Sequence, residues 1–130
     1  MSEYLFTYGT LRINQNHPMA TFLEENAKLV GLALISNAKL YRIDWFPAMI
    51  SSAIETDQVV GDLFEINENI NWKLIDEYEG IGIGEPPYEY KRVKVQVTTE
   101  TRVIESWAYF YNLPLPADAE LIESGDFLNP

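Results

Sequence analysis

The sequence predicts an α+β fold in which a curled or closed β-sheet is accompanied by one well-formed helix and one weaker helix. Three observations support this prediction. Short segments rich in β-branched and aromatic residues recur along the chain, the apolar period becomes helical in only two places, and no repeat or linker divides the 130 residues. We therefore expect residues 1–130 to form a single domain that buries its own core.

Strand patterns dominate the first half of the chain. An aromatic run stops at Gly9, a residue type that often ends a strand in a tight turn. Pro18 can begin a short helix, and Gly31 marks a bulge or a close backbone approach inside an apolar strand. The expected strands cover residues 4–8, 29–35, 40–43 and 59–66, and an aromatic loop covers residues 44–48.

The second half begins with the clearest helix and continues into two strands. A helical apolar period predicts a helix over residues 67–79, capped by Asn67 or Asn69. After a turn-rich loop, valines at alternate positions predict a strand, and an aromatic-rich strand follows it. These two strands cover residues 93–97 and 102–111, and they can pair as a hairpin around residues 98–101.

The composition excludes several classes of function. Twenty acidic side chains against nine basic ones give a formal charge of -11, which repels phosphate backbones and anionic lipid surfaces. The lack of cysteine and the single histidine, His17, exclude thiol chemistry, a Ser-His-Asp triad and a multi-histidine metal site. The sequence has no long apolar run and no signal-peptide pattern. We expect a cytoplasmic monomer or weak dimer that binds a small molecule, without a cofactor, nucleic acid or membrane as partner.

Glu79 is the candidate acid/base residue. At about 100° per residue, the helix centres its apolar side on Ile70, Leu74 and Tyr78, and Asp76 falls on the solvent side. Glu79 lies at the apolar edge near the C-terminal end, where desolvation and the helix dipole both raise a carboxyl pKa. A raised pKa suits general acid/base catalysis. Position alone leaves open the alternative that Glu79 points to water at a frayed helix end.

The turn after the first strand is the candidate anion site. Gly9 permits unusual backbone dihedral angles, so its amide group and those of Thr10 and Leu11 can converge on an anion. Arg12 adds positive potential nearby. An ordinary strand-ending turn explains the same residues, and this alternative stays open. Tyr90 lies on the face of its strand opposite the valines, so it can reach the same cleft.

Short segments spread along the chain form a pattern in a fixed order. They are Tyr8-Gly9-Thr10-Leu11-Arg12, Phe46-Pro47-Ala48-Met49, Val60-Gly61-Asp62-Leu63-Phe64-Glu65-Ile66, Asp76-Glu77-Tyr78-Glu79-Gly80, Tyr90-Lys91-Arg92 and Ser124-Gly125-Asp126-Phe127. In this order and spacing they resemble the γ-glutamylcyclotransferase-like family, also called AIG2-like, which includes the γ-glutamylamine cyclotransferases. The resemblance covers essentially the whole chain.

The resemblance implies a small mixed β-barrel with flanking helices and a pocket at the first-strand turn. It also implies that Glu79 is the catalytic acid/base of a reaction without a cofactor, in which a γ-glutamyl amide or amine cyclises to 5-oxoproline. The substrate-binding residues implied in this way are Tyr8, Gly9, Thr10, Leu11, Arg12 and Tyr90.

Two departures from the family pattern leave the leaving group open. The loop over residues 80–87 is rich in glycine and proline, and Phe127 stands where the family often has Trp. Two other functions fit the same residues. One is a binding module that recognises a metabolite without turnover, and the other is an amide hydrolase in which Glu79 activates water instead of the substrate amine.

Overall fold

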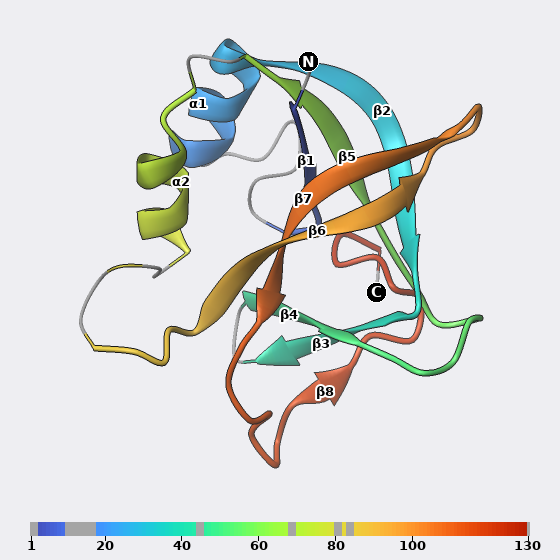
Figure 1. Ribbon diagram of the computed structural model, residues 1–130. Coiled ribbons are helices and arrows are strands. Elements are labelled where there is room, and N and C mark those ends of the chain that lie inside the picture. Colours follow the sequence, from blue (N-terminus) through green and yellow to red (C-terminus); the bar gives the residue numbers. More distant parts are fainter. Residues whose placement is uncertain are drawn as a thin grey trace.

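The computed structural model describes residues 3–9, 18–43, 46–67, 70–79, 82 and 85–129. Figure 1 shows the arrangement of the helices and strands in these ranges. In chain order they are β1 (Glu3–Thr7), α1 (Pro18–Asn26), β2 (Ala27–Ser36), β3 (Ala38–Ile43), β4 (Phe46–Ser51), β5 (Gln58–Ile66), α2 (Trp72–Tyr78), β6 (Tyr90–Thr98), β7 (Val103–Tyr111) and β8 (Glu120–Leu121).

Five strands close into a barrel in the order β1-β5-β2-β6-β7. The barrel is completed by β1, which pairs antiparallel with β5 and parallel with β7. In β2 the register shifts between Leu29 and Gly31, and Gly31 has a φ of 147°, so the expected bulge is confirmed. The α+β fold and the closed, mixed sheet are confirmed as well.

A second sheet lies at one end of the barrel (Figure 1) and has the strand order β4-β3-β8. Its strand β4 contradicts the aromatic loop predicted over residues 44–48, because Phe46, Pro47 and Ala48 are paired with β3. Residues 44–45 lie outside the described residues. Proline is tolerated in β4 because β4 is the edge strand of this sheet.

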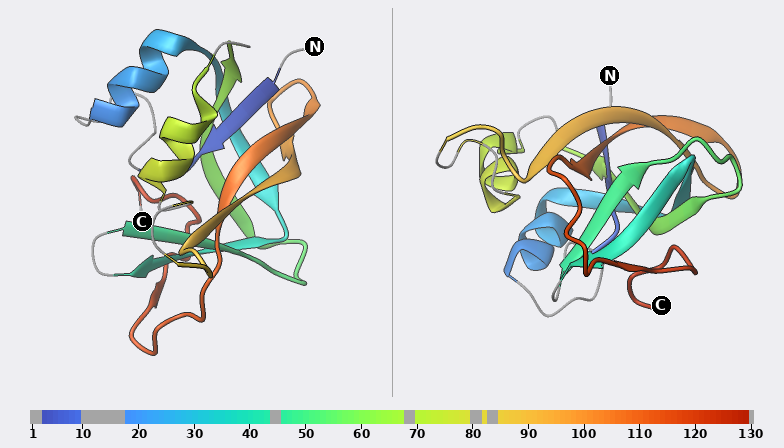
Figure 2. Two further views of the ribbon diagram at one scale, coloured as in Figure 1. Left: turned by 60° about the vertical axis from the view of Figure 1, so that its left-hand side comes forward. Right: turned by 90° about the horizontal axis from the view of Figure 1, so that it is seen from below.

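The two helices lie side by side on the outside of the barrel (Figure 2). Their apolar residues pack on the outer side of β1, where Leu5 contacts the same cluster as Leu23 of α1 and Ile75 of α2. The next residue, Phe6, belongs instead to the cluster that fills the barrel, together with Leu63. Among the described residues, no helix is long and apolar enough to span a membrane.

The element boundaries differ from the expectation mainly in α2. The helix begins at Trp72, and its N-cap is Asn71 instead of Asn67 or Asn69. The Asn71 side chain accepts a hydrogen bond from the Leu74 N–H at 3.2 Å. The predicted hairpin is confirmed, because β6 pairs antiparallel with β7 from Thr98 back to Tyr90.

Candidate active site

Glu79 is the C-cap of α2 and directly follows its last residue, Tyr78. Its backbone nitrogen lies 3.2 Å from the carbonyl oxygen of Ile75 and 3.1 Å from that of Asp76. Ile75 is the buried residue of the helix, whereas Leu74 is 39% exposed. The prediction that the apolar side centres on Leu74 is therefore wrong. Glu79 follows Ile75 by one helical turn and shares its buried side, which places its side chain toward the barrel.

The surroundings of the Glu79 carboxyl favour its protonated form. Part of the residue remains exposed, but the carboxyl group itself lies among protein atoms. Burial first, and then the negative charges of Glu89 and Asp76, raise the pKa of Glu79 from 4.5 to about 8. A group with this pKa can both accept and donate a proton near neutral pH, as general acid/base catalysis requires.

Three buried tyrosines, one each from the end of β1, from β6 and from β7, are close enough to Glu79 to be affected by its charge. They are Tyr8, Tyr90 and Tyr109. Burial is the largest cause that raises the pKa of each hydroxyl, and the charge of Glu79 raises it as well. All three phenols therefore stay protonated and act as hydrogen-bond donors.

Hydrogen bonds from two of these tyrosines join four strands, β1 with β7 and β6 with β4. The Tyr8 hydroxyl donates to the carbonyl oxygen of Tyr109 at 2.5 Å, and the Tyr90 hydroxyl donates to the carbonyl oxygen of Pro47 at 2.5 Å. Pro47 also packs against Gly9, where an added Cβ atom would lie 2.6 Å from Pro47 Cγ. The end of β1 and the starts of β4 and β6 therefore meet beside Glu79.

Asp76 is part of this region, although its predicted place was the solvent side of the helix. That prediction is wrong, because its side chain is only 19% exposed. The carboxylate accepts hydrogen bonds from the Tyr109 hydroxyl at 2.6 Å and from Arg92 Nε at 2.9 Å. Within the described ranges, no group of three or more histidine, cysteine or acidic side chains is placed to hold a metal ion.

The predicted substrate-binding residues fall into two groups. Tyr8, Gly9 and Tyr90 lie together, and the charge of Glu79 acts on both tyrosine hydroxyls. The other predicted residues, Thr10, Leu11 and Arg12, lie outside the described residues. The anion-binding role of this turn therefore stays a prediction.

Tyr109 lies near Glu79 and Asp76 but was not among the predicted site residues, because an aromatic-rich strand is more often part of a core than of a binding site. A signal for it was present in the hairpin. In the structure Thr98 pairs with Val103, and counting back from this turn pairs Arg92 with Tyr109. That register places Tyr109 on the same outer face as Tyr90, next to α2.

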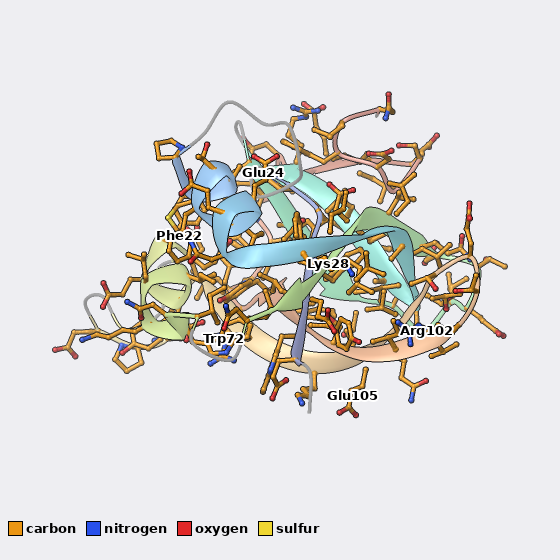
Figure 3. All side chains as sticks on the ribbon, turned by 90° about the horizontal axis from the view of Figure 1, so that it is seen from above. Phe22, Glu24, Lys28, Trp72, Arg102 and Glu105 are labelled. Carbon is orange, nitrogen blue, oxygen red and sulfur yellow. The ribbon has the colours of Figure 1, made fainter. Side chains whose placement is uncertain are left out.

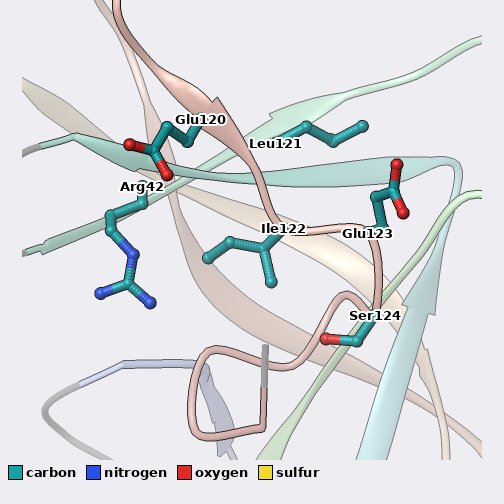
Figure 4. A pocket seen from close by; sticks show the side chains of 6 residues that line it. All are labelled: Arg42, Glu120, Leu121, Ile122, Glu123 and Ser124. Carbon is teal, nitrogen blue, oxygen red and sulfur yellow. The ribbon is translucent and has the colours of Figure 1, made fainter.

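A separate cleft of about 610 Å³ lies beside β3 and β8. Figure 4 shows Arg42 and Ile122 pointing to one side of these strands and Glu123 to the other. The Arg42 guanidinium lies 5.1 Å from the centroid of the Phe127 ring, so this departure from the family pattern packs on an arginine. The cleft is not lined by Glu79 or the tyrosines near it, and we assign it no part in the chemistry.

The chain is similar to one known protein family and to a curated protein. The model of the family described as "Gamma-glutamyl cyclotransferase, AIG2-like" matches residues 5–129. The chain belongs to this family. A curated relative, the gamma-L-glutamyl-butirosin B gamma-glutamyl cyclotransferase of Niallia circulans, is 31% identical over 113 residues, in a match that covers 83% of this chain and 66% of the relative. The chain thus spans slightly less than two thirds of that relative's length.

Two solved structures illustrate the fold of this AIG2-like chain. Protein ytfP from Escherichia coli is 29% identical, with a TM-score of 0.69 that covers 97% of this chain and 96% of that one. An AIG2-like protein from Mus musculus has a TM-score of 0.69 at 20% identity, covering 88% of this chain and 80% of that one. At that identity the mouse protein shows a shared fold alone.

Proposed function

We propose that this chain is a γ-glutamyl cyclotransferase that releases 5-oxoproline from a γ-glutamyl amide or amine, with Glu79 as general acid/base. The observation that carries the proposal is the Glu79 carboxyl, which lies among protein atoms and has a pKa raised to about 8. In a member of this family, such a carboxyl can exchange a proton with the substrate amine.

Glu79 acts first as a base. The α-amino group of a γ-glutamyl substrate arrives as an ammonium group, which has no electron pair for attack. The Glu79 carboxylate accepts one of its protons, and the freed amine forms a bond to the γ-carbonyl carbon. A tetrahedral intermediate results.

Glu79 acts next as an acid. It delivers the proton to the nitrogen of the leaving amine while the original amide C–N bond breaks. The ring nitrogen loses a second proton as it becomes an amide N–H, and the released amine takes up that proton. Glu79 is a carboxylate again, and the products are 5-oxoproline and a free ammonium compound.

The rest of the site has to hold the substrate in a reactive conformation. We place the substrate's α-carboxylate at the amide groups of Gly9, Thr10 and Leu11, with Arg12 adding positive charge. Because the nucleophile belongs to the substrate, positioning alone can lower the barrier by roughly 7–11 kcal/mol. The Tyr90 hydroxyl already donates to a carbonyl oxygen, so it shapes the site instead of transferring a proton.

Identification of the products tests this proposal. The wild-type chain is incubated with γ-glutamyl amino acids, γ-glutamyl amines and γ-glutamyl-ε-lysine, and the products are identified by mass spectrometry. We expect 5-oxoproline from at least one substrate. Glutamate as the product would instead support the amide hydrolase, and saturable binding of 5-oxoproline without turnover of any substrate would support the binding module.

Further expectations accompany this proposal. We expect a single domain that acts in the cytoplasm as a monomer or weak dimer, with a small γ-glutamyl compound as its partner. The charge of -11 makes nucleic acids and anionic membranes unfavourable partners. Size-exclusion chromatography over a range of concentrations measures the oligomeric state.

A further inference from the structure

An ion pair lies beside Glu79, and its arginine contacts two tryptophan rings that meet at a steep angle of 65°. Arg92 binds the Asp76 carboxylate through two bonds, Nε to Oδ1 at 2.9 Å and Nη2 to Oδ2 at 3.3 Å. The guanidinium lies 4.3 Å from the ring centroid of Trp72 and 4.5 Å from that of Trp107. The two side chains of the ion pair are only 23% and 19% exposed. Water therefore screens this pair less than an ordinary surface pair.

The ion pair is connected directly to Glu79. Asp76 lies in the last turn of α2, and its carbonyl oxygen accepts the backbone N–H of Glu79 at 3.1 Å. The helix has only seven residues, and a helix this short is not stable by itself in water. Its position against the barrel, and with it the position of the Glu79 carboxyl, must come from tertiary contacts such as the one between Asp76 and Arg92.

A second path leads from the ion pair to the end of β1. The hydroxyl of Tyr109 donates to Asp76 Oδ1 at 2.6 Å. The carbonyl oxygen of the same tyrosine accepts the Tyr8 hydroxyl at 2.5 Å. Tyr8 directly precedes Gly9, where the predicted anion-binding turn begins. One continuous set of contacts thus joins Arg92, through Asp76 and Tyr109, to the other half of the site.

We propose that Asp76 and Arg92 are positioning residues that hold Glu79 and the Tyr8 end of β1 in a fixed relation to each other. This inference rests on the proposed function, because it assigns the two residues a role in presenting the acid/base group. Lysine cannot replace Arg92, because a single ammonium group cannot donate to both Asp76 oxygens in the same fork geometry while lying over the Trp72 and Trp107 rings.

The decisive variants are Arg92→Lys, which keeps the charge, and Asp76→Asn, which keeps the shape. A displacement of a catalytic group by about 1 Å can cost on the order of 100-fold in rate. We therefore expect kcat to fall on the order of 100-fold in both variants, with KM changed by less than about threefold. Tyr109→Phe removes only one bond to Asp76, and we expect a smaller loss, on the order of tenfold.

Glu105→Gln is the matched control. Its carboxylate pairs with Lys94 at 3.7 Å on the same hairpin, but its side chain is 66% exposed. Figure 3 shows Glu105 at the edge of the molecule, away from Phe22 and Trp72 of the two helices. Here kcat should stay within about twofold of the wild-type value. A purely structural ion pair would lower the melting temperature of Arg92→Lys and leave kcat per folded molecule unchanged, which would overturn the inference.

Hydrogen exchange gives a readout that needs no turnover. The Glu79 amide is bonded to two carbonyl oxygens in the wild-type chain. We expect its exchange to be at least about tenfold faster in Arg92→Lys and Asp76→Asn and unchanged in Glu105→Gln. Unchanged exchange in all variants would overturn the inference. A wild-type chain without turnover on any γ-glutamyl substrate would contradict the proposed function while leaving this exchange test in force.

Discussion

Glu77 and Glu79 stand close together in the sequence and occupy opposite environments. The Glu77 side chain is 40% exposed and forms a surface pair with Lys73 at 3.9 Å. The Glu79 carboxyl lies among protein atoms, near two other carboxylates. Ionisation of Glu79 is therefore unfavourable in the folded state and costs nothing extra in the unfolded chain. This difference makes the stability of the protein depend on pH.

The free energy of unfolding of the wild-type chain should fall as the pH rises through the range in which Glu79 is ionised only in the unfolded state. Unfolding returns the pKa of Glu79 from about 8 to 4.5. Between these values the native state binds more protons than the unfolded chain, so the free energy of unfolding decreases with pH, by at most about 5 kcal/mol. We expect Glu79→Gln to become more stable than the wild type over this range.

Urea denaturation of both proteins from about pH 5 to about pH 8 measures this difference. Glu77→Gln serves as the control and should follow the wild-type curve, because its side chain is exposed. A Glu79→Gln curve that runs parallel to the wild-type curve over the whole range would contradict the raised pKa of Glu79.

At this scale the helical period placed Glu79 at the apolar edge of the helix but left its burial open, and it predicted no contact for Asp76. Its place one turn after Ile75, at the end of an apolar helical period, is a local property that helical geometry reveals. Arg92 and Tyr109 reach Asp76 from strands that follow later in the chain, and their contacts depend on strand register. That register follows from the hairpin only when the residues of its turn are known exactly, and the sequence placed the turn only within residues 98–101.

At the scale of helices and strands, the prediction also succeeded where a local pattern defines the element and failed where a distant contact does. Strands β6 and β7 were predicted because alternate valines, an aromatic-rich run and the turn between them are local signals, although β6 begins at Tyr90 instead of residue 93. Strand β4 was missed because Pro47 indicates a loop unless the strand is known to lie at an edge. The predicted start of α2 at residue 67 was wrong because Asn71 caps the helix. Asn67 and Asn69 are the same type of residue, so the preference for asparagine at an N-cap does not choose among the three.

The C-terminal segment is attached to β5 through Gly125. Its carbonyl oxygen accepts the Val60 N–H at 2.7 Å, and its φ of 71° lies in the left-handed region. An added Cβ atom would lie 1.9 Å from the carbonyl oxygen of Gln58. Because that oxygen belongs to a paired strand, the backbone cannot move aside without breaking the pairing.

Gly125→Ala should therefore lower the free energy of unfolding by about 2–4 kcal/mol. Gly31→Ala is the matched control, because Gly31 also has a positive φ, of 147°, but no atom lies within 4 Å of the added Cβ. We expect that variant to lose about 1–2 kcal/mol, from backbone strain alone. Thermal unfolding compares the two, and equal losses would contradict the clash at Gln58.

At the scale of the whole molecule, two apolar clusters use opposite faces of the same strands. One cluster fills the barrel, and the other lies beneath the helices that carry Glu79. Closure depends on the parallel pairing of β1 with β7, in which Leu5 lies opposite Trp107. Residues so distant in sequence give no local signal of their pairing. The pattern of short strands predicted a curled or closed sheet, and the family resemblance implied the mixed barrel.

Phe6 should be essential for the barrel because it is 1% exposed and lies in the interior cluster. We expect Phe6→Ala to lower the free energy of unfolding by about 3–5 kcal/mol, since the cavity cannot collapse in a closed sheet. Leu32→Ala removes a side chain that is 62% exposed and should change the stability by less than about 0.5 kcal/mol. Comparable urea midpoints for the two variants would contradict this account of the core.

The central claim is that Glu79 transfers the protons of a cyclisation, and the rate of 5-oxoproline release tests it most directly. Wild type, Glu79→Gln and Glu77→Gln are compared by mass spectrometry on one γ-glutamyl amide, after circular dichroism has shown that all three are folded. We expect Glu77→Gln to stay within about twofold of the wild type and Glu79→Gln to lose on the order of 10³-fold. Release of 5-oxoproline by Glu79→Gln at the wild-type rate would contradict the mechanism.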